Sequence, residues 1–282
     1  MIFFKIKRYF SLDFFKFIFV RFLIIRKVKK YYRKHFKNKN CLTASSIEYV
    51  TLFSKKKDIL ESLDKDGFSK KIALDKKVND FIINNYKNSQ FICNKRFKGK
   101  TIFNSFDELQ SFAVQNSKKI PYFELKNNAF NKLFKEIATS RNVLDIVENY
   151  IGGVSKVDIK LNYSPVCDLN NDIRESYSQT VTWHYDVHDI NFVYVFFYIN
   201  GSDKYSGAHE IIKGSHKKKK FFKHLIGSVK QDHKELKNFY NDKDFFTIEG
   251  EKGEGFIEDT SCFHRALPPK KNPRLCLQLR YH

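Results

Sequence analysis

The chain has 282 residues, of which 42% are hydrophobic, 16% aromatic and 29% charged, and its formal net charge is +21. This composition excludes an intrinsically disordered protein, and the length suits one large domain with a substantial core, with two small domains as the alternative. The five cysteines are scattered and no two lie at zinc-finger spacing, which is typical of reduced thiols in a cytoplasmic protein.

More than half of the excess positive charge lies in the first 40 residues. They contain thirteen Lys or Arg against one acid, Asp13, a formal charge of +12. Their longest apolar run, 14–25, is too short to span a bilayer and contains Lys16 and Arg21, and no small-residue cleavage site of a secretory signal follows. We therefore separate residues 1–45, a basic and aromatic-rich segment, from a domain over 46–282.

Two interpretations of this basic segment stay open. A helix within residues 1–40 either packs on the domain or trails from it, or it rests on an anionic membrane surface, where each cation adds about 1 kcal/mol. Nucleic acid is the other natural polyanion, but the chain carries no nucleic-acid-binding motif, which disfavours that partner. The oligomeric state does not follow from the sequence.

The first half of the domain is predicted to be helical. Residues 54–86 are typical of helix, loop, helix, with the break at Asp66-Gly67-Phe68. Residues 91–119 show no clear period. Residues 128–150 predict two amphipathic helices, interrupted near Ser140 and ended by Gly152-Gly153.

After residue 153 the period changes from that of a helix to that of a strand. Alternating or continuous apolar runs predict strands over 157–163, 192–199, 209–212, 245–248, 255–257 and 275–281. Residues 217–240 interrupt this series as an exposed, basic and helical insert. The fold class predicted is mainly β with helical additions (α+β): a double-stranded β-helix, or jelly-roll and cupin-like core, braced by N-terminal helices.

Within the β region, His184 and Asp186 are two residues apart and share one face of an extended segment. A third ligand has to come from elsewhere, and His264 is the best candidate because it follows a predicted strand and a turn. Two imidazoles and one carboxylate with open positions are what non-haem Fe(II) requires. Arg274, at the start of the last strand, is placed to bind a carboxylate.

Other polar residues near these positions have simpler explanations. His188 and Asp189 form a second pair that we expect at the rim of the site or behind the ligands. His209 and His216 are expected to be packing residues, since three ligands are already assigned.

The ordered set of motifs resembles the phytanoyl-CoA dioxygenase-like family of Fe(II)/2-oxoglutarate oxygenases over about residues 60–282. The matching pieces are Leu63 to Phe68, Val143 to Gly152, Trp183-His184-Tyr185-Asp186, Gly207 to Lys217, Gly253 to Asp259, His264-Arg265 and Arg274. The resemblance implies that His184, Asp186 and His264 bind Fe(II) and are the catalytic centre. It also implies that Arg274 anchors the distal carboxylate of 2-oxoglutarate, and that O2 is the oxidant.

Two positions qualify this resemblance. Family members that halogenate carry a small residue at the position of Asp186, so the intact carboxylate favours hydroxylation or a related oxidation. The family's second contact to 2-oxoglutarate, a polar residue two positions after the distal histidine, is here Ala266. Lys160, Asn162 or Thr182 are the candidates to replace it.

The function predicted from the sequence is hydroxylation of a small or carrier-linked metabolite, with release of succinate and CO2, in the cytoplasm or at the inner face of the membrane. The alternative is a catalytically silent jelly-roll protein that binds a sugar or lipid head group at a membrane surface. A third possibility is a cupin-type enzyme with another metal and no 2-oxoglutarate, against which Arg274 argues.

Overall fold

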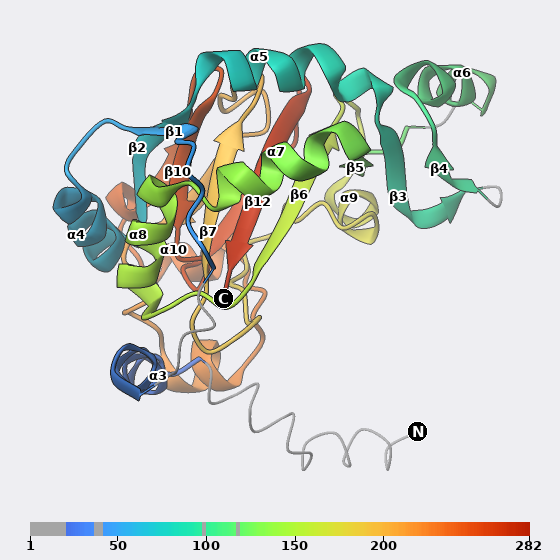
Figure 1. Cartoon of the computed structure of the whole chain (residues 1–282). Helices are drawn as coiled ribbons and strands as arrows, with labels where there is room; N and C mark the ends of the chain where they lie inside the picture. The colour runs from blue at the N-terminus through green and yellow to red at the C-terminus, as the bar shows by residue number, and fades with distance from the viewer. Residues whose placement is uncertain (1–20, 37–41, 98–99, 117–118) are drawn as a thin grey trace, which may run out of the picture.

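The computed structural model describes residues 21–36, 42–97, 100–116 and 119–282. It is built on two antiparallel sheets (Figure 1). The large sheet has nine strands, in the spatial order β1 (Val50–Leu52), β2 (Phe68–Leu74), β10 (Glu254–Glu258), β7 (Val193–Tyr198), β12 (Arg274–Tyr281), β6 (Val157–Ser164), β5 (Phe123–Lys126), β3 (Gln90–Phe97) and β4 (Lys100–Phe103). The small sheet has the order β11 (His264–Ala266), β8 (His209–Ile212) and β9 (Phe245–Ile248). This is the predicted fold class, a double-stranded β-helix with helical additions.

The two faces of the large sheet pack against different partners. In β7, Val193, Val195 and Phe197 belong to the main core on the helical side. The intervening side chains, Tyr194, Phe196 and Tyr198, pack toward the small sheet. Because successive side chains of a strand point to opposite faces, the continuous apolar run serves two cores, as expected for a strand buried on both sides.

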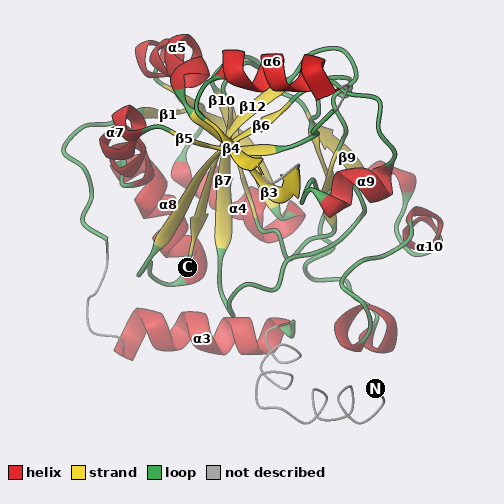
Figure 2. Ribbon diagram, turned by 90° about the vertical axis from the view of Figure 1, so that its right-hand side faces the viewer, coloured by secondary structure: helices red, strands yellow, loops and turns green. Residues whose placement is uncertain are grey.

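Helices cover the outer face of the large sheet (Figures 1 and 2). They are α4 (Lys56–Asp66), α5 (Lys76–Asn85), α6 (Phe106–Asn116), α7 (Asn128–Ala138) and α8 (Arg141–Ile151), and each contributes buried apolar residues to the main core. Ser140 separates α7 from α8, and Gly152, at φ 87°, ends α8 in the left-handed conformation that favours glycine. The two helices predicted over 128–150 are thus confirmed.

Two parts of the chain differ from the sequence prediction. Residues 54–86 form helix, strand, helix, because β2 follows the turn at Gly67 and pairs with β1 and β10. The unassigned residues 91–119 supply β3, β4 and α6. Strand β2 pairs with β10, which is distant in sequence, and local periodicity does not report such pairing. Strands β3 and β4 pair with each other as neighbours in the chain, but their residues show no clear period.

The insert over 217–240 is only partly helical and only partly exposed. It contains the single turn η2 (Phe221–Ile226) and the short α10 (His233–Lys237). Leu236 and Tyr240 are buried against Trp183 and Phe263, so the insert packs on the segments that lead to His184 and His264. Three further short helices are α9 (Asn171–Ser176), η1 (Tyr86–Asn88) and η3 (Asp242–Asp244).

The described part of the basic N-terminal segment forms α3 (Leu23–Phe36), which lies against the end of the domain from which loops emerge (Figure 2). Arg26 pairs with the buried carboxylate of Asp259 at 2.7 Å. This part of the segment therefore packs on the domain with one side, which does not exclude contact of its other side with a membrane surface. The predictions for residues 1–20 and 37–41 lie outside the described residues. Within the described ranges, no helix combines the length and apolarity needed to cross a bilayer.

Candidate metal centre

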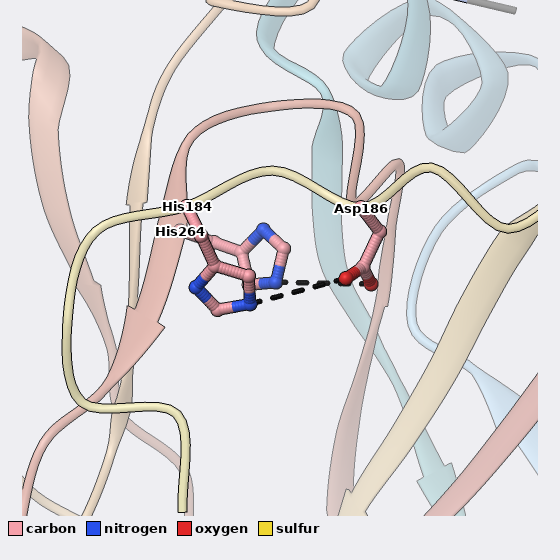
Figure 3. A group of neighbouring side chains, drawn as sticks. All are labelled: His184, Asp186 and His264. Atoms are coloured by element: carbon pink, nitrogen blue, oxygen red, sulfur yellow. Dashed lines mark ion pairs between the residues drawn. The ribbon is translucent and has the colours of Figure 1, made fainter. Parts of the chain in front are cut away.

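His184, Asp186 and His264 come together at the open end between the two sheets. The backbones of His184 and His264 exchange two hydrogen bonds, of 3.0 and 2.8 Å, and the amide of Asp186 donates to the carbonyl of Thr260 at 2.8 Å. This pairing brings one ligand atom of each of the three side chains within 4.8 Å of the others (Figure 3). The alternate side chains, Trp183 and Tyr185, point away into a buried cluster.

Backbone carbonyls orient both imidazoles. Nδ1 of His184 lies 2.9 Å from the carbonyl oxygen of Thr182, and Nδ1 of His264 lies 3.0 Å from that of Cys262. A carbonyl oxygen can accept a hydrogen bond but cannot donate one. Each Nδ1 therefore carries the proton, and each Nε2 keeps its lone pair. Both Nε2 atoms face the carboxylate of Asp186 at 3.9 Å (Figure 3). Three lone-pair donors thus point at one space, the arrangement that a divalent cation requires.

The protonation states of Asp186 and His264 favour binding of a cation. Burial alone would raise the pKa of Asp186, but a hydrogen bond from His188 and the two ligand imidazoles hold it well below its usual range. Burial and the neighbouring His184 lower the pKa of His264 to about 4. At neutral pH the ligand set therefore already includes an ionised carboxylate and a neutral His264 imidazole. Nε2 of His188, 3.5 Å from the Asp186 carboxylate, lies at the rim position expected for it.

A cavity of about 420 Å³ contains the three ligands and extends to Arg274. The guanidinium of Arg274 is buried and donates to the carbonyl of Gly207 at 2.5 Å and to the hydroxyl of Ser164 at 3.4 Å. Its Nε is buried and has no hydrogen-bond acceptor among the residues that the structure describes. A buried cationic donor without an acceptor is costly by itself, and a carboxylate ligand would supply that acceptor.

The three candidates to replace the polar residue missing at Ala266 have different surroundings. The Asn162 amide lines the cavity but is engaged, since it accepts from the Tyr122 hydroxyl at 2.8 Å and donates to Gln278 at 3.0 Å. Lys160 lies on the cavity wall, paired with Glu124 at 2.7 Å. Thr182 does not line the cavity, and its backbone instead carries the carbonyl that orients His184. Of the three candidates, Thr182 is thus the one that the structure places outside the cavity.

Sequence reasoning missed Tyr122 and the pair formed by His209 and Glu258. His209, expected to be a packing residue, also lines the cavity, with its ring centroid 5.2 Å from that of His264. Its Nδ1 lies 2.9 Å from the fully buried carboxyl of Glu258, although the two groups are not aligned as a hydrogen bond. Burial raises the pKa of Glu258 to about 8, which favours the uncharged acid behind the ligands.

Local sequence carries little signal for these residues. Tyr122 precedes a strand of only four residues, and Glu258 ends a strand as an ordinary polar residue. In contrast, His216 behaves as expected: it lies outside the cavity, with Nδ1 3.2 Å from the Cys262 sulfur.

Comparisons with known proteins identify a fold. No family model matches the chain, and no curated protein matches it either. Among solved structures, EctD from S. alaskensis with bound Fe aligns with a TM-score of 0.52 at 12% identity, covering 85% of this chain and 83% of that one. The non-heme alpha ketoglutarate dependent epimerase SnoN from nogalamycin biosynthesis aligns with a TM-score of 0.50 at 11% identity, covering 80% of this chain and 82% of that one. At such identities the likeness establishes the shared fold.

Proposed function

We propose that this protein is an Fe(II)/2-oxoglutarate-dependent oxygenase that hydroxylates a small or carrier-linked metabolite. The observation that carries the proposal is one cavity in which His184, Asp186 and His264 converge and Arg274 presents a buried donor that has no acceptor in the described part of the chain. The names of the two structural neighbours, one with bound Fe and one alpha ketoglutarate dependent, support the same chemistry. Within this class, the motif order supports the phytanoyl-CoA dioxygenase-like family.

The residues present fit both groups that this chemistry needs. Two imidazole nitrogens and one carboxylate on one face are a donor set for Fe(II) that leaves the opposite positions open. Arg274 would hold the distal carboxylate of 2-oxoglutarate. We assign the second contact, lost at Ala266, to the hydroxyl of Tyr122, because this side chain lines the same cavity and its oxygen already takes part in the hydrogen-bond network with Asn162.

Iron held by these three residues, together with 2-oxoglutarate, would supply O2 activation, with one oxygen atom going to succinate, formed with CO2, and the other to a C–H bond of the substrate. The chain's own residues prepare this reaction. The carbonyls of Thr182 and Cys262 keep the ligand imidazoles in one tautomer, and His188 orients the Asp186 carboxylate. Aromatic side chains of Tyr194 and Phe196 wall the cavity and exclude bulk water.

The alternative of a silent jelly-roll binding protein requires that the three ligands be displaced from one another or that the last strand be missing. The convergent ligand atoms and the formed β12 favour the enzyme instead. In a cupin-type enzyme without 2-oxoglutarate, no co-substrate carboxylate would be present to accept a hydrogen bond from the buried Nε of Arg274.

An anaerobic titration tests the proposal directly. Addition of Fe(II) and then 2-oxoglutarate to the full chain should give the weak visible absorption band of a chelated 2-oxo acid. His264→Ala should abolish the band, and Arg274→Leu should weaken binding of 2-oxoglutarate about a hundredfold or more while leaving binding of Fe(II) unchanged, because a buried charge-assisted contact is lost.

Arg141→Leu is the matched control, since Arg141 is exposed at the start of α8, far from the cavity lining. Its titration should follow that of the wild type. If wild-type protein with Fe(II) shows no band and no binding of 2-oxoglutarate, the proposal is wrong. Hydroxylation itself is checked by transfer of one labelled oxygen atom from O2 to a turned-over substrate.

A further inference from the structure

Helix α3 has two faces of different character. Arg26, Lys29 and Arg33 point toward the domain, where they contact Asp259 or Asp189. At helical spacing a second set of side chains falls on the opposite side. We call this set the outer face; its members are Ile24, Lys27, Val28, Tyr31 and Lys34.

The inner contacts fix how α3 is turned. Arg26 is buried, pairs with Asp259 at 2.7 Å and also donates to the hydroxyl of Ser261. Its carbonyl accepts from the buried amide of Asn191 at 3.0 Å. These bonds leave the outer face directed away from the domain. Figure 2 shows α3 lying along one end of the domain.

The outer face is apolar and basic at once. Ile24 is 68% exposed, Val28 61% and Tyr31 61%, and Lys27 and Lys34 are exposed beside them. Residues 21–36 contain seven Lys or Arg and no acidic residue. Exposure of large aliphatic side chains to water is unfavourable in free energy. A helix surface that combines such side chains with cations matches the boundary between lipid head groups and acyl chains.

We propose that α3 docks this protein on an anionic lipid surface through its outer face. Charge complementarity selects the partner, because the cations of α3 are drawn to a negative surface potential while Ile24 and Val28 enter the head-group layer. A nucleic acid would satisfy the cations but would leave the two aliphatic side chains in water. The inner face remains attached to the loops of the domain, so docking orients the whole protein at the surface.

The proposal does not depend on the metal or on the reaction. A single helix with a few inserted side chains binds reversibly, and the electrostatic share of its binding falls as salt screens the charges. Sedimentation with vesicles of phosphatidylcholine and phosphatidylserine should therefore capture the full chain at low salt and less of it at high salt. Vesicles of phosphatidylcholine alone should capture little.

A pair of double variants tests the face itself. Lys27→Glu with Val28→Asp should weaken partitioning onto the anionic vesicles about tenfold or more. Val114→Asp with Lys135→Glu is the matched control: it makes the same change in charge at an 80% exposed valine of α6 and an exposed lysine of α7, and it should sediment as the wild type does. Circular dichroism and unfolding midpoints check that both variants are folded.

Three results would overturn the proposal. They are no capture of the wild type by anionic vesicles, equal loss of capture in both double variants, and capture by duplex DNA that depends on Lys27 while vesicles are not bound. Loss confined to the outer-face variant supports it, whatever the iron titration shows.

Discussion

At the scale of single residues, the site depends on hydrogen bonds that no ligand motif specifies. The carbonyls of Thr182 and Cys262 decide which nitrogen of each imidazole faces Asp186. At the other end of the cavity, Tyr122 and Asn162 surround the space beside Arg274. The two ends together define a slot with a cation-binding side and a carboxylate-binding side, which is what a metal-chelating dicarboxylate needs.

Removal of the Tyr122 hydroxyl tests the carboxylate-binding end. Tyr122→Phe should weaken binding of 2-oxoglutarate about tenfold, because a hydrogen bond to a charged group contributes about 1.5 kcal/mol or more, and should leave binding of Fe(II) unchanged. Anaerobic titration with each ligand measures both effects. Tyr86→Phe, a partly buried tyrosine outside the cavity, is the control. If Tyr122→Phe binds 2-oxoglutarate with unchanged affinity, Tyr122 does not make the second contact, and Lys160 becomes the next candidate.

At the scale of elements, α3 acts as a brace across the two loops that flank the ligands. Asp189 and Asn191 follow Asp186 in the chain, and Asp259 precedes His264 by five residues. Lys29 and Arg26 of the helix contact both loops. Burial alone would raise the pKa of Asp259, but the Arg26 guanidinium holds it well below the usual range.

The buried Arg26–Asp259 pair should therefore contribute stability that depends on pH. Arg26→Met should lower the free energy of unfolding at neutral pH by about 3 kcal/mol, because it leaves a buried carboxylate uncompensated. Asp259 has a depressed pKa in the folded protein, so its contribution is present above the unfolded value of about 4 and is lost as the pH falls. The difference between the wild type and Arg26→Met should narrow in acid.

Urea unfolding at pH 7 and near pH 4 measures this difference. Lys56→Met is the comparison, since Lys56 and Asp145 form a pair whose side chains are 41% and 42% exposed, and its loss should cost under about 1 kcal/mol. Asp259→Asn added to Arg26→Met should recover part of the stability. Equal effects of Arg26→Met and Lys56→Met would contradict the role of α3 as a brace.

At the scale of the whole molecule, metal binding should be coupled to folding. The ligands lie on segments that are 78 residues apart in the chain, His184 and Asp186 before β7 and His264 at the start of β11, so the unfolded chain offers no comparable site. A cation that binds only the folded protein stabilises it by mass action.

Co(II), or Fe(II) without air, at about a hundred times its dissociation constant should raise the free energy of unfolding by about 2.7 kcal/mol. Thermal or urea unfolding measures the change, and a chelator should reverse it. His264→Ala should lose this stabilisation, whereas Arg274→Leu should keep it, because Arg274 is not a ligand. An equal shift in wild type and His264→Ala would show that the metal binds elsewhere.

Much of the fold was predictable because local pattern and tertiary role agree. The alternating residues of β6 and β12 and the apolar run of β7 predicted these strands, and β7 is buried at every position. Ser140 and Gly152 marked the ends of helices because the backbone conformation at a helix end depends on the residue at that position. Strand β2, however, follows Gly67 as a short mixed segment whose identity depends on pairing with β10, nearly two hundred residues away.

The sequence by itself determined the order and type of the metal-ligand candidates and of Arg274, because strand spacing and residue chemistry are read along the chain. Only the tertiary structure decided which side chains share the cavity. It brought in Tyr122 and His209, placed Glu258 behind His209 and left Thr182 outside, because proximity between distant strands depends on register and not on local composition. The tertiary structure also fixed the rotation of α3 about its axis. The ion pair between the buried Arg26 and Asp259 holds one side of the helix on the domain, so Ile24 and Val28 face outward.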